Sequence, residues 1–129
     1  MNDSIFTKII RGEIPSHKIY EDDKTFAFLD INPKQPGHVL VVTKVQIDKV
    51  YDLDDENYCA LWTTVQKIAK HMEKVLGRRI SFDVVGVDVP HAHVHLVPFD
   101  SSQDLTVKKQ SPSQEELAAM AEKLQLTPG

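Results

Sequence analysis

Cysteine is nearly absent from this sequence of 129 residues, since Cys59 is the single one. One cysteine cannot form an intramolecular disulfide or a zinc site built from several thiolates, and this scarcity is typical of proteins from a reducing compartment. The stability of the chain must therefore come from a hydrophobic core. The sequence supplies one, because 41% of its residues are apolar and a chain of this length buries roughly two-thirds of its unfolded surface.

Long apolar runs and an excess of positive charge are also missing. No stretch approaches the roughly 20 apolar residues of a membrane-spanning helix, and the segment Met1-Asn2-Asp3-Ser4 lacks the features of a signal peptide. The 15 basic residues are outnumbered by 19 acidic ones, which argues against a surface that coats nucleic acid. We expect a cytoplasmic protein without membrane or nucleic-acid partners. A small anionic ligand in a locally positive pocket remains compatible with this balance.

Helices are predicted in three places. Apolar residues recur at three- and four-residue spacing over residues 55–76, and Gly77 follows where a C-terminal cap belongs. A short helix is expected after Ser4, which can cap it. A C-terminal helical tail is expected over about residues 111–125, with Ser111 as its N-cap.

Strands are predicted between these helices, and together they indicate the fold class. Strand-forming runs stand at residues 18–21, 25–30, 38–43, 80–87 and 92–99. We find no internal repeat or linker, so residues 1–129 are expected to form a single domain. Strands with a long helix among them and helices at both ends predict an α+β domain on a mainly antiparallel sheet.

Three histidines alternate with apolar residues at the start of the last strand-forming run, the first of them just before it. Side chains of a strand alternate between its two faces, so His91, His93 and His95 are expected on one face and the residues between them in the core. Each imidazole brings two ring nitrogens that need partners. Three in a row are therefore hard to explain as packing alone.

Spacing alone leaves three interpretations of this triplet open. Alternating histidines can bind zinc through neutral ring nitrogens, with His38, Asp88 or Asp100 as a further ligand. One imidazole can instead attack phosphorus or an acyl carbon, while its neighbours orient it and stabilise developing charge. A structural or pH-sensitive ladder of histidines is the third interpretation. The spacing favours the metal site without deciding among them.

The order of the motifs resembles the histidine triad (HIT) family of nucleotide-binding hydrolases and transferases. The family signature alternates three histidines with apolar residues, and it stands here as His91-Ala92-His93-Val94-His95-Leu96-Val97. Residues 5–15 resemble the N-terminal segment of the family, and residues 26–33 and 36–44 match its middle block in order and spacing. The resemblance covers about residues 4–99, and it implies a HIT-like domain.

The resemblance also implies a mechanism. His93 would be the nucleophile that attacks the α-phosphorus of a purine nucleoside 5′-phosphoramidate or a related nucleotide conjugate. Water would then cleave the nucleotidyl-histidine intermediate and release a nucleoside monophosphate. His91 would orient His93 and share in proton handling, and His95 and His38 would contact phosphate oxygens. The chemistry agrees, because an unprotonated imidazole is abundant near neutral pH.

The nucleoside is expected in an apolar slot beside a carboxylate. By pattern alone, Asp30 is either a turn-initiating aspartate or a carboxylate that binds a sugar diol, and the resemblance makes it the ribose-binding group. The matching slot residues are Phe6, Ile9, Phe28, Leu29 and Ile31. Ile9 and Phe28 are equally compatible with ordinary core positions. The resemblance further implies a homodimer formed through the long helix and a sheet edge.

Departures from the family pattern bear on function. Many relatives carry a Cys-x-x-Cys that helps to bind structural zinc where this chain has Ser4 and Thr7, so we predict neither a metal ion nor another cofactor. Gln46 stands where the family often has a histidine. The loop of residues 86–90 is short, and Val87 stands where relatives place a phosphate-contacting glutamine. These changes keep open an alternative, a nucleotide-binding or partner-binding protein with weak or vestigial catalysis.

Overall fold

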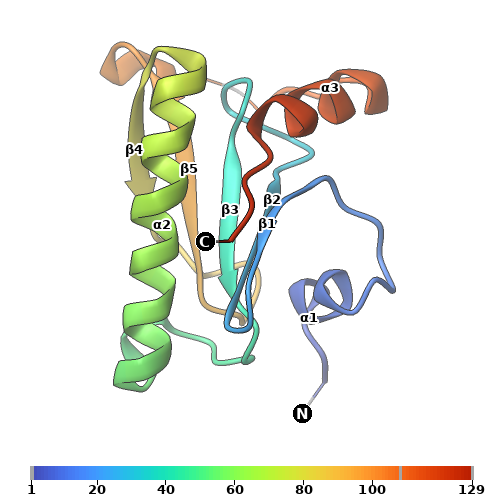
Figure 1. The fold of residues 1–129 in the computed structure, drawn as a ribbon, viewed down its shortest axis with the longest axis vertical. Coiled ribbons are helices and arrows are strands. Elements are labelled where there is room, and N and C mark those ends of the chain that lie inside the picture. The colour runs from blue at the N-terminus through green and yellow to red at the C-terminus, as the bar shows by residue number, and fades with distance from the viewer. Residues whose placement is uncertain (1, 108, 129) are drawn as a thin grey trace.

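A computed structural model describes residues 2–107 and 109–128 (Figure 1). Antiparallel strands form one sheet in the order β1-β2-β3-β5-β4. The strands are β1 (Lys18–Glu21), β2 (Thr25–Leu29), β3 (Val39–Thr43), β4 (Arg79–Asp83) and β5 (His93–Phe99). The helices are α1 (Ile5–Ile10), α2 (Asp55–Leu76) and α3 (Gln114–Leu124), with short 3-10 turns at Val50–Asp52 and Ser102–Leu105. This is the α+β architecture that the sequence predicts.

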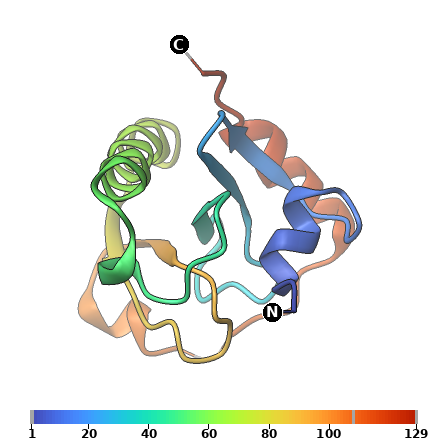
Figure 2. The same cartoon turned by 90° about the horizontal axis from the view of Figure 1, so that it is seen from below.

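Different helices cover the two faces of the sheet, and Figure 2 shows α1 and α2 on opposite sides of the strands. On one face, Val94 and Leu96 of β5 join a core with residues of α2 and α3. On the other face, strand residues pack against α1; this smaller cluster comprises Phe6, Ile9, Phe26, Phe28, Leu40 and Val42. His93 and His95 pair with Val42 and Leu40 across the ladder, so they share the α1 face. The predicted alternation of histidines with core residues along β5 is confirmed.

Helix α2 begins and ends where the sequence predicts. Asp54 caps its first turn by accepting the Asn57 N–H, and Gly77 ends it in the left-handed conformation with a φ of 69°. The buried residues of α2 are Leu61, Thr64, Val65, Ile68 and Met72, which form one stripe against the sheet. Over the described residues, no helix is long and apolar enough to cross a membrane.

The strand predicted over residues 80–87 is shorter in the structure and starts one residue earlier. Its last paired residue is Asp83, which lies opposite His95. Beyond that point Gly86 has a φ of 74°, a conformation that breaks the pleat of a strand. Residues 84–87 therefore form an irregular segment, and this correction matters because that segment lines the cavity beside His93.

The ends of three other predicted elements also shift. The C-terminal helix is capped by Ser113 and not by Ser111, because Ser113 and Glu116 bond reciprocally in a complete capping box. Strand β2 ends before Asp30, whose carboxylate accepts the Asn32 N–H and turns the chain. Strand β3 starts at Val39, so His38 lies just before the ladder.

Candidate active site

The ring of His93 has one engaged and one available nitrogen. Its Nδ1 lies 2.6 Å from the main-chain oxygen of His91. A carbonyl oxygen only accepts, so Nδ1 must carry a proton, and in the neutral ring Nε2 holds the lone pair. Within the described part of the chain, Nε2 has no hydrogen-bond partner. A neutral imidazole with a free Nε2 is the form that can act as a nucleophile.

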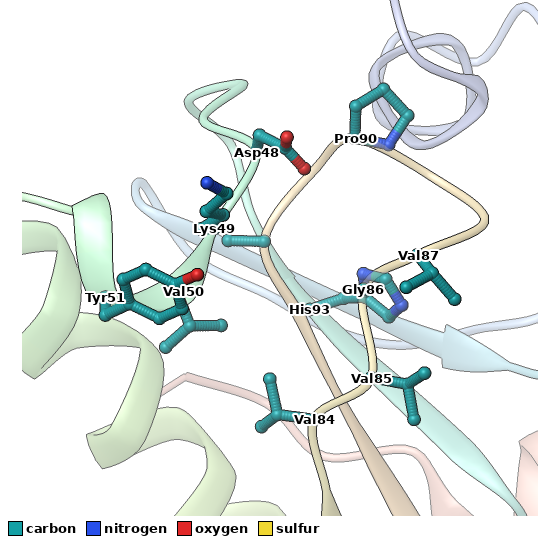
Figure 3. A pocket seen from close by; sticks show the side chains of 11 residues that line it. Asp48, Lys49, Val50, Tyr51, Val84, Val85, Gly86, Val87, Pro90 and His93 are labelled. Carbon is teal, nitrogen blue, oxygen red and sulfur yellow. The ribbon is translucent and has the colours of Figure 1, made fainter.

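This ring faces a cavity of about 380 Å³, and Figure 3 shows it directed toward Gly86 and Val87. The cavity lies between two irregular segments, residues 48–51 and 84–87. Apolar side chains form much of its wall, since Val84, Val85 and Val87 all line it. Because His93 is among the residues that line this cavity, a substrate bound there would lie beside its ring.

His91 occupies a different environment from the other two histidines of the triplet. It lies before the first residue of β5, and its side chain is fully buried. Its Nδ1 is 2.6 Å from Ser4 Oγ, and its Nε2 is 2.5 Å from the main-chain oxygen of Thr43. Burial lowers the pKa of His91 below its usual value. Both ring nitrogens are thus engaged within the protein, and the contribution of His91 to the site is its main-chain oxygen.

His38 and His95 form a hydrogen-bonded pair in which the position of each proton can be assigned. The Lys34 N–H donates to Nδ1 of His38 over 3.1 Å, so the proton of that neutral ring lies on Nε2. This Nε2 lies 3.0 Å from Nδ1 of His95 and donates to it. The proton of a neutral His95 is consequently on its own Nε2. His95 is thereby arranged as a hydrogen-bond donor.

The electrostatic surroundings keep this pair neutral. Burial lowers the pKa of His38 to about 4, although the nearby Asp30 carboxylate opposes the shift. Burial also lowers the pKa of His95. Oδ2 of Asp30 lies 3.7 Å from Nε2 of His38, while Lys34 and Lys109 lie close enough to act on His38 by repulsion. This end of the site therefore combines two neutral imidazoles, one carboxylate and two cations.

We expect the free energy of unfolding to fall as the pH drops from 6.5 toward 4. Folded His38 resists protonation while the unfolded residue accepts a proton near pH 6.5, so stability is present above that pH and is lost on acidification. The full shift of the His38 pKa corresponds to roughly 3 kcal/mol of unfolding free energy. The lowered pKa values of His91 and His95 also make the folded protein less stable at low pH. Urea unfolding between pH 7.5 and 4.5 measures this. His38→Gln should flatten the dependence; equal slopes in this variant and the unmutated chain would contradict the assignment.

The structure brings three of the five predicted slot residues together and separates Leu29 and Ile31 from them. Phe6 packs edge-on against Phe28 and His93, with ring centroids 5.6 and 4.9 Å apart, and Ile9 belongs to the same cluster. Leu29 is a correction: it belongs to the core on the opposite face, because neighbouring residues of a strand point to opposite sides. Ile31 is 54% exposed, at the rim.

Among the described residues, one group of side chains could hold a metal ion, namely Asp30, His38 and His95 with ligand atoms within 4.8 Å of one another. The hydrogen bonds do not fit this use, because Nε2 of His38 carries a proton and offers no lone pair. Asp100 is also unsuited as a further ligand, since it pairs with Arg78 at 3.2 Å. We derive no step through a metal ion.

Hydroxyl groups stand in this chain where many relatives have the cysteines that help to bind structural zinc. Ser4 and Thr7 place hydroxyl groups beside His91, at 2.6 and 3.3 Å from its Nδ1. Zinc prefers thiolate, imidazole and carboxylate ligands, so a neutral hydroxyl pair does not fit it. The sequence predicts only a helix-capping role for Ser4 and none for Thr7, and the signal for their contact with His91 is their place in the N-terminal motif. Lys49 and Tyr51, which line the cavity, carry no recognisable motif.

Fold and site together define a small α+β domain with histidines arranged on one face of its sheet. Residues 11–102 match the family model of the HIT domain, so the chain belongs to the HIT family. It is similar to the purine nucleoside phosphoramidase of Escherichia coli (35% identity over 102 residues, covering 74% of this chain and 86% of that protein). The adenosine 5′-monophosphoramidase of Saccharomyces cerevisiae is 35% identical over 96 residues, 73% of this chain and 61% of that protein. A crystal structure of a HIT-like protein from Bartonella henselae superposes with a TM-score of 0.84 at 35% identity, over 96% of this chain and 95% of that one.

Proposed function

We propose that this chain is a nucleotide hydrolase that cleaves purine nucleoside 5′-phosphoramidates or related nucleotide conjugates through a nucleotidyl-histidine intermediate. The observation that carries the proposal is the tautomer of His93, which the main-chain oxygen of His91 holds with Nε2 unprotonated beside the cavity. The names of the Escherichia coli and Saccharomyces cerevisiae relatives support the substrate class.

The reaction would proceed in two displacements at phosphorus. Nε2 of His93 forms a bond to the α-phosphorus while the bond from phosphorus to the leaving group breaks, and the departing amine takes a proton from solvent. Water then attacks the same phosphorus, the bond to Nε2 breaks, and a proton returns to solvent. The products are the free amine and a nucleoside monophosphate. The histidine is regenerated in its original tautomer.

Each neighbour of His93 has a distinct part in this proposal. His95 donates its Nε2–H to a phosphate oxygen, and His38 fixes that proton by donating to His95 Nδ1. His91 orients His93 but takes no part in proton transfer, because both of its ring nitrogens are engaged and buried. This role is narrower than the one the family resemblance implies.

The nucleoside would bind between α1 and the sheet. Phe6, Ile9 and Phe28 supply apolar surface for the base, and Ile31 covers the rim of the slot. Asp30 keeps Oδ2 available for the ribose hydroxyls, since its other oxygen accepts the Asn32 N–H. An apolar slot of this kind presents similar surfaces to adenine and guanine.

The experiment that tests this function is a rapid acid quench with adenosine 5′-phosphoramidate, followed by mass spectrometry of the intact protein and an assay of AMP. A nucleotidyl adduct together with AMP release is expected.

The alternative is a nucleotide-binding module with vestigial catalysis, which is favoured by Val87, an apolar and 80% exposed residue beside the nucleophile. Measurable AMP binding with neither adduct nor turnover would support that alternative.

We also propose that the chain forms a homodimer through α2 and β4. Strand β4 is the last in the sheet, and its Phe82 is 51% exposed. Phe82 packs against Trp62, which packs against Tyr58, with ring centroids 6.3 Å apart in both pairs. A sheet edge beside an exposed aromatic row is typical of a surface that another chain covers.

Phe82→Glu is expected to halve the mass of the protein in solution, because a buried carboxylate at the interface is costly. Light scattering coupled to size-exclusion chromatography measures the mass at several concentrations. Val107→Glu is the matched control, since Val107 is an exposed apolar residue outside α2 and β4. A single mass shared by the unmutated chain and Phe82→Glu would refute this interface.

A further inference from the structure

A serine at the start of α1 contacts one of the three histidines of the triplet. Ser4 is the N-cap of α1, and its buried hydroxyl lies 2.6 Å from Nδ1 of His91 across 87 residues of sequence. We propose that Ser4, supported by Thr7 and Gln46, is a positioning residue for catalysis, acting on His93 through His91. The proposal rests on the function proposed above and adds a dedicated support for its nucleophile.

The partners of His91 determine which group donates and which accepts in each hydrogen bond between Thr43, His91 and Ser4. Nε2 of His91 faces the main-chain oxygen of Thr43, which only accepts, so the proton of the ring lies on Nε2. Nδ1 is then an acceptor, and the hydroxyl of Ser4 must donate to it. The hydroxyl oxygen in turn accepts the Thr7 N–H at 3.0 Å. One side chain thereby caps the helix and holds the ring of His91 through its Nδ1 atom.

Gln46 ties this cap to the end of β3. Its Oε1 accepts both the Ser4 N–H and the Thr7 hydroxyl, each at 2.7 Å. Its Nε2 donates to the main-chain oxygen of Asn2 at 2.8 Å. Three segments that are distant in sequence, at residues 2–7, 46 and 91, are thus joined by hydrogen bonds with directional preferences. We call Ser4, Thr7, Gln46 and His91 the clamp.

The clamp ends at the atom that selects the tautomer of His93. A ring of His91 fixed at both nitrogens also fixes the direction of its main-chain oxygen, which receives the His93 Nδ1–H at 2.6 Å. Phe6 lies in the first turn of α1 and packs against both rings, with centroids 5.8 Å from His91 and 4.9 Å from His93. Displacement of this turn would therefore move the nucleophile.

Ser4→Ala is expected to lower kcat by roughly 10- to 100-fold while KM stays within about twofold, because misplacement of a reacting group affects the transition state most. Ser4→Thr keeps the hydroxyl and should restore most of kcat. Ser113→Ala is the matched control, since Ser113 caps α3 in the same way without contacting the clamp. Wild-type kcat in Ser4→Ala, or equal losses in Ser4→Ala and Ser113→Ala, would overturn the proposal.

A second measurement does not depend on turnover. Long-range ¹H–¹⁵N spectra of the histidine rings report which nitrogen carries the proton, and we expect Nε2–H for His91 and Nδ1–H for His93. Ser4→Ala removes the donor to Nδ1 of His91, while Thr43 still holds the Nε2–H of that ring. The ¹⁵N resonances of His91 should therefore shift, and those of His93 should shift with the main-chain oxygen that receives its Nδ1–H. An unchanged His93 spectrum would overturn the proposal even if the substrate assignment fails. Gln46→Met serves if Ser4→Ala does not fold, because it leaves the hydroxyl of Ser4 in place; shifted ¹⁵N resonances of His93 are again expected, and unchanged ones refute the clamp.

Discussion

Replacement of His93 by alanine is expected to abolish turnover of adenosine 5′-phosphoramidate, with a loss in kcat of roughly 10⁴- to 10⁶-fold. The imidazole supplies the bond to phosphorus, and no other ring nitrogen in the described part of the cavity can replace it, since His93 is the histidine that lines it. Binding of AMP should persist within about tenfold, because the slot and Asp30 are untouched. Acid-quench mass spectrometry and isothermal titration measure the two effects separately.

The control for this variant is His17→Ala, which removes a partly exposed histidine that bonds Gln114 on the C-terminal helix. Its kcat should equal that of the unmutated chain. A His93→Ala protein that keeps its turnover, or that still forms an adduct at another histidine, would show that the assigned nucleophile is wrong. Circular dichroism shows whether a His93→Ala protein without turnover is still folded, and so separates loss of the nucleophile from unfolding.

His95→Ala is expected to lower kcat by roughly 10²- to 10³-fold, the effect of removing one donor to a developing charge. The reason is geometric: the hydrogen bonds of Lys34, His38 and His95 leave the His95 Nε2–H as a donor directed away from the pair. His95→Gln places an amide N–H near the same position and should recover most of the rate. Steady-state assays with the unmutated chain and both variants measure the effect.

The dependence on leaving group tests whether His95 stabilises charge or transfers a proton. A hydrogen-bond donor to the phosphate should give the same loss for phosphoramidates of strongly and weakly basic amines. A proton donor to the leaving group would give a loss that grows with the basicity of the amine. A strong dependence would therefore contradict the assigned role of His95, as would a variant His95→Gln that is no better than His95→Ala.

The sequence determined those features whose signals are local. The bounds of α2 follow from helical periodicity, a capping aspartate and a glycine at residue 77, all within one stretch of chain. The common face of His93 and His95 follows from the two-residue repeat of a strand. The order of motifs was sufficient to indicate the family, because the triad and its upstream blocks are short and their spacing is fixed.

Tertiary structure decided which hydrogen bonds the site residues make. Sequence placed His91 with the other two histidines, yet its ring is held by Ser4 and Thr43 at distances of 87 and 48 residues along the chain. The two-residue repeat puts Phe28 and Leu29 on opposite faces of β2, and the packing of the helices decided which face each side chain takes. The tautomers of the histidines depend on acceptors supplied by distant main-chain groups. Periodicity gives the direction of a side chain, but only the folded packing of separate segments gives each nitrogen its partner.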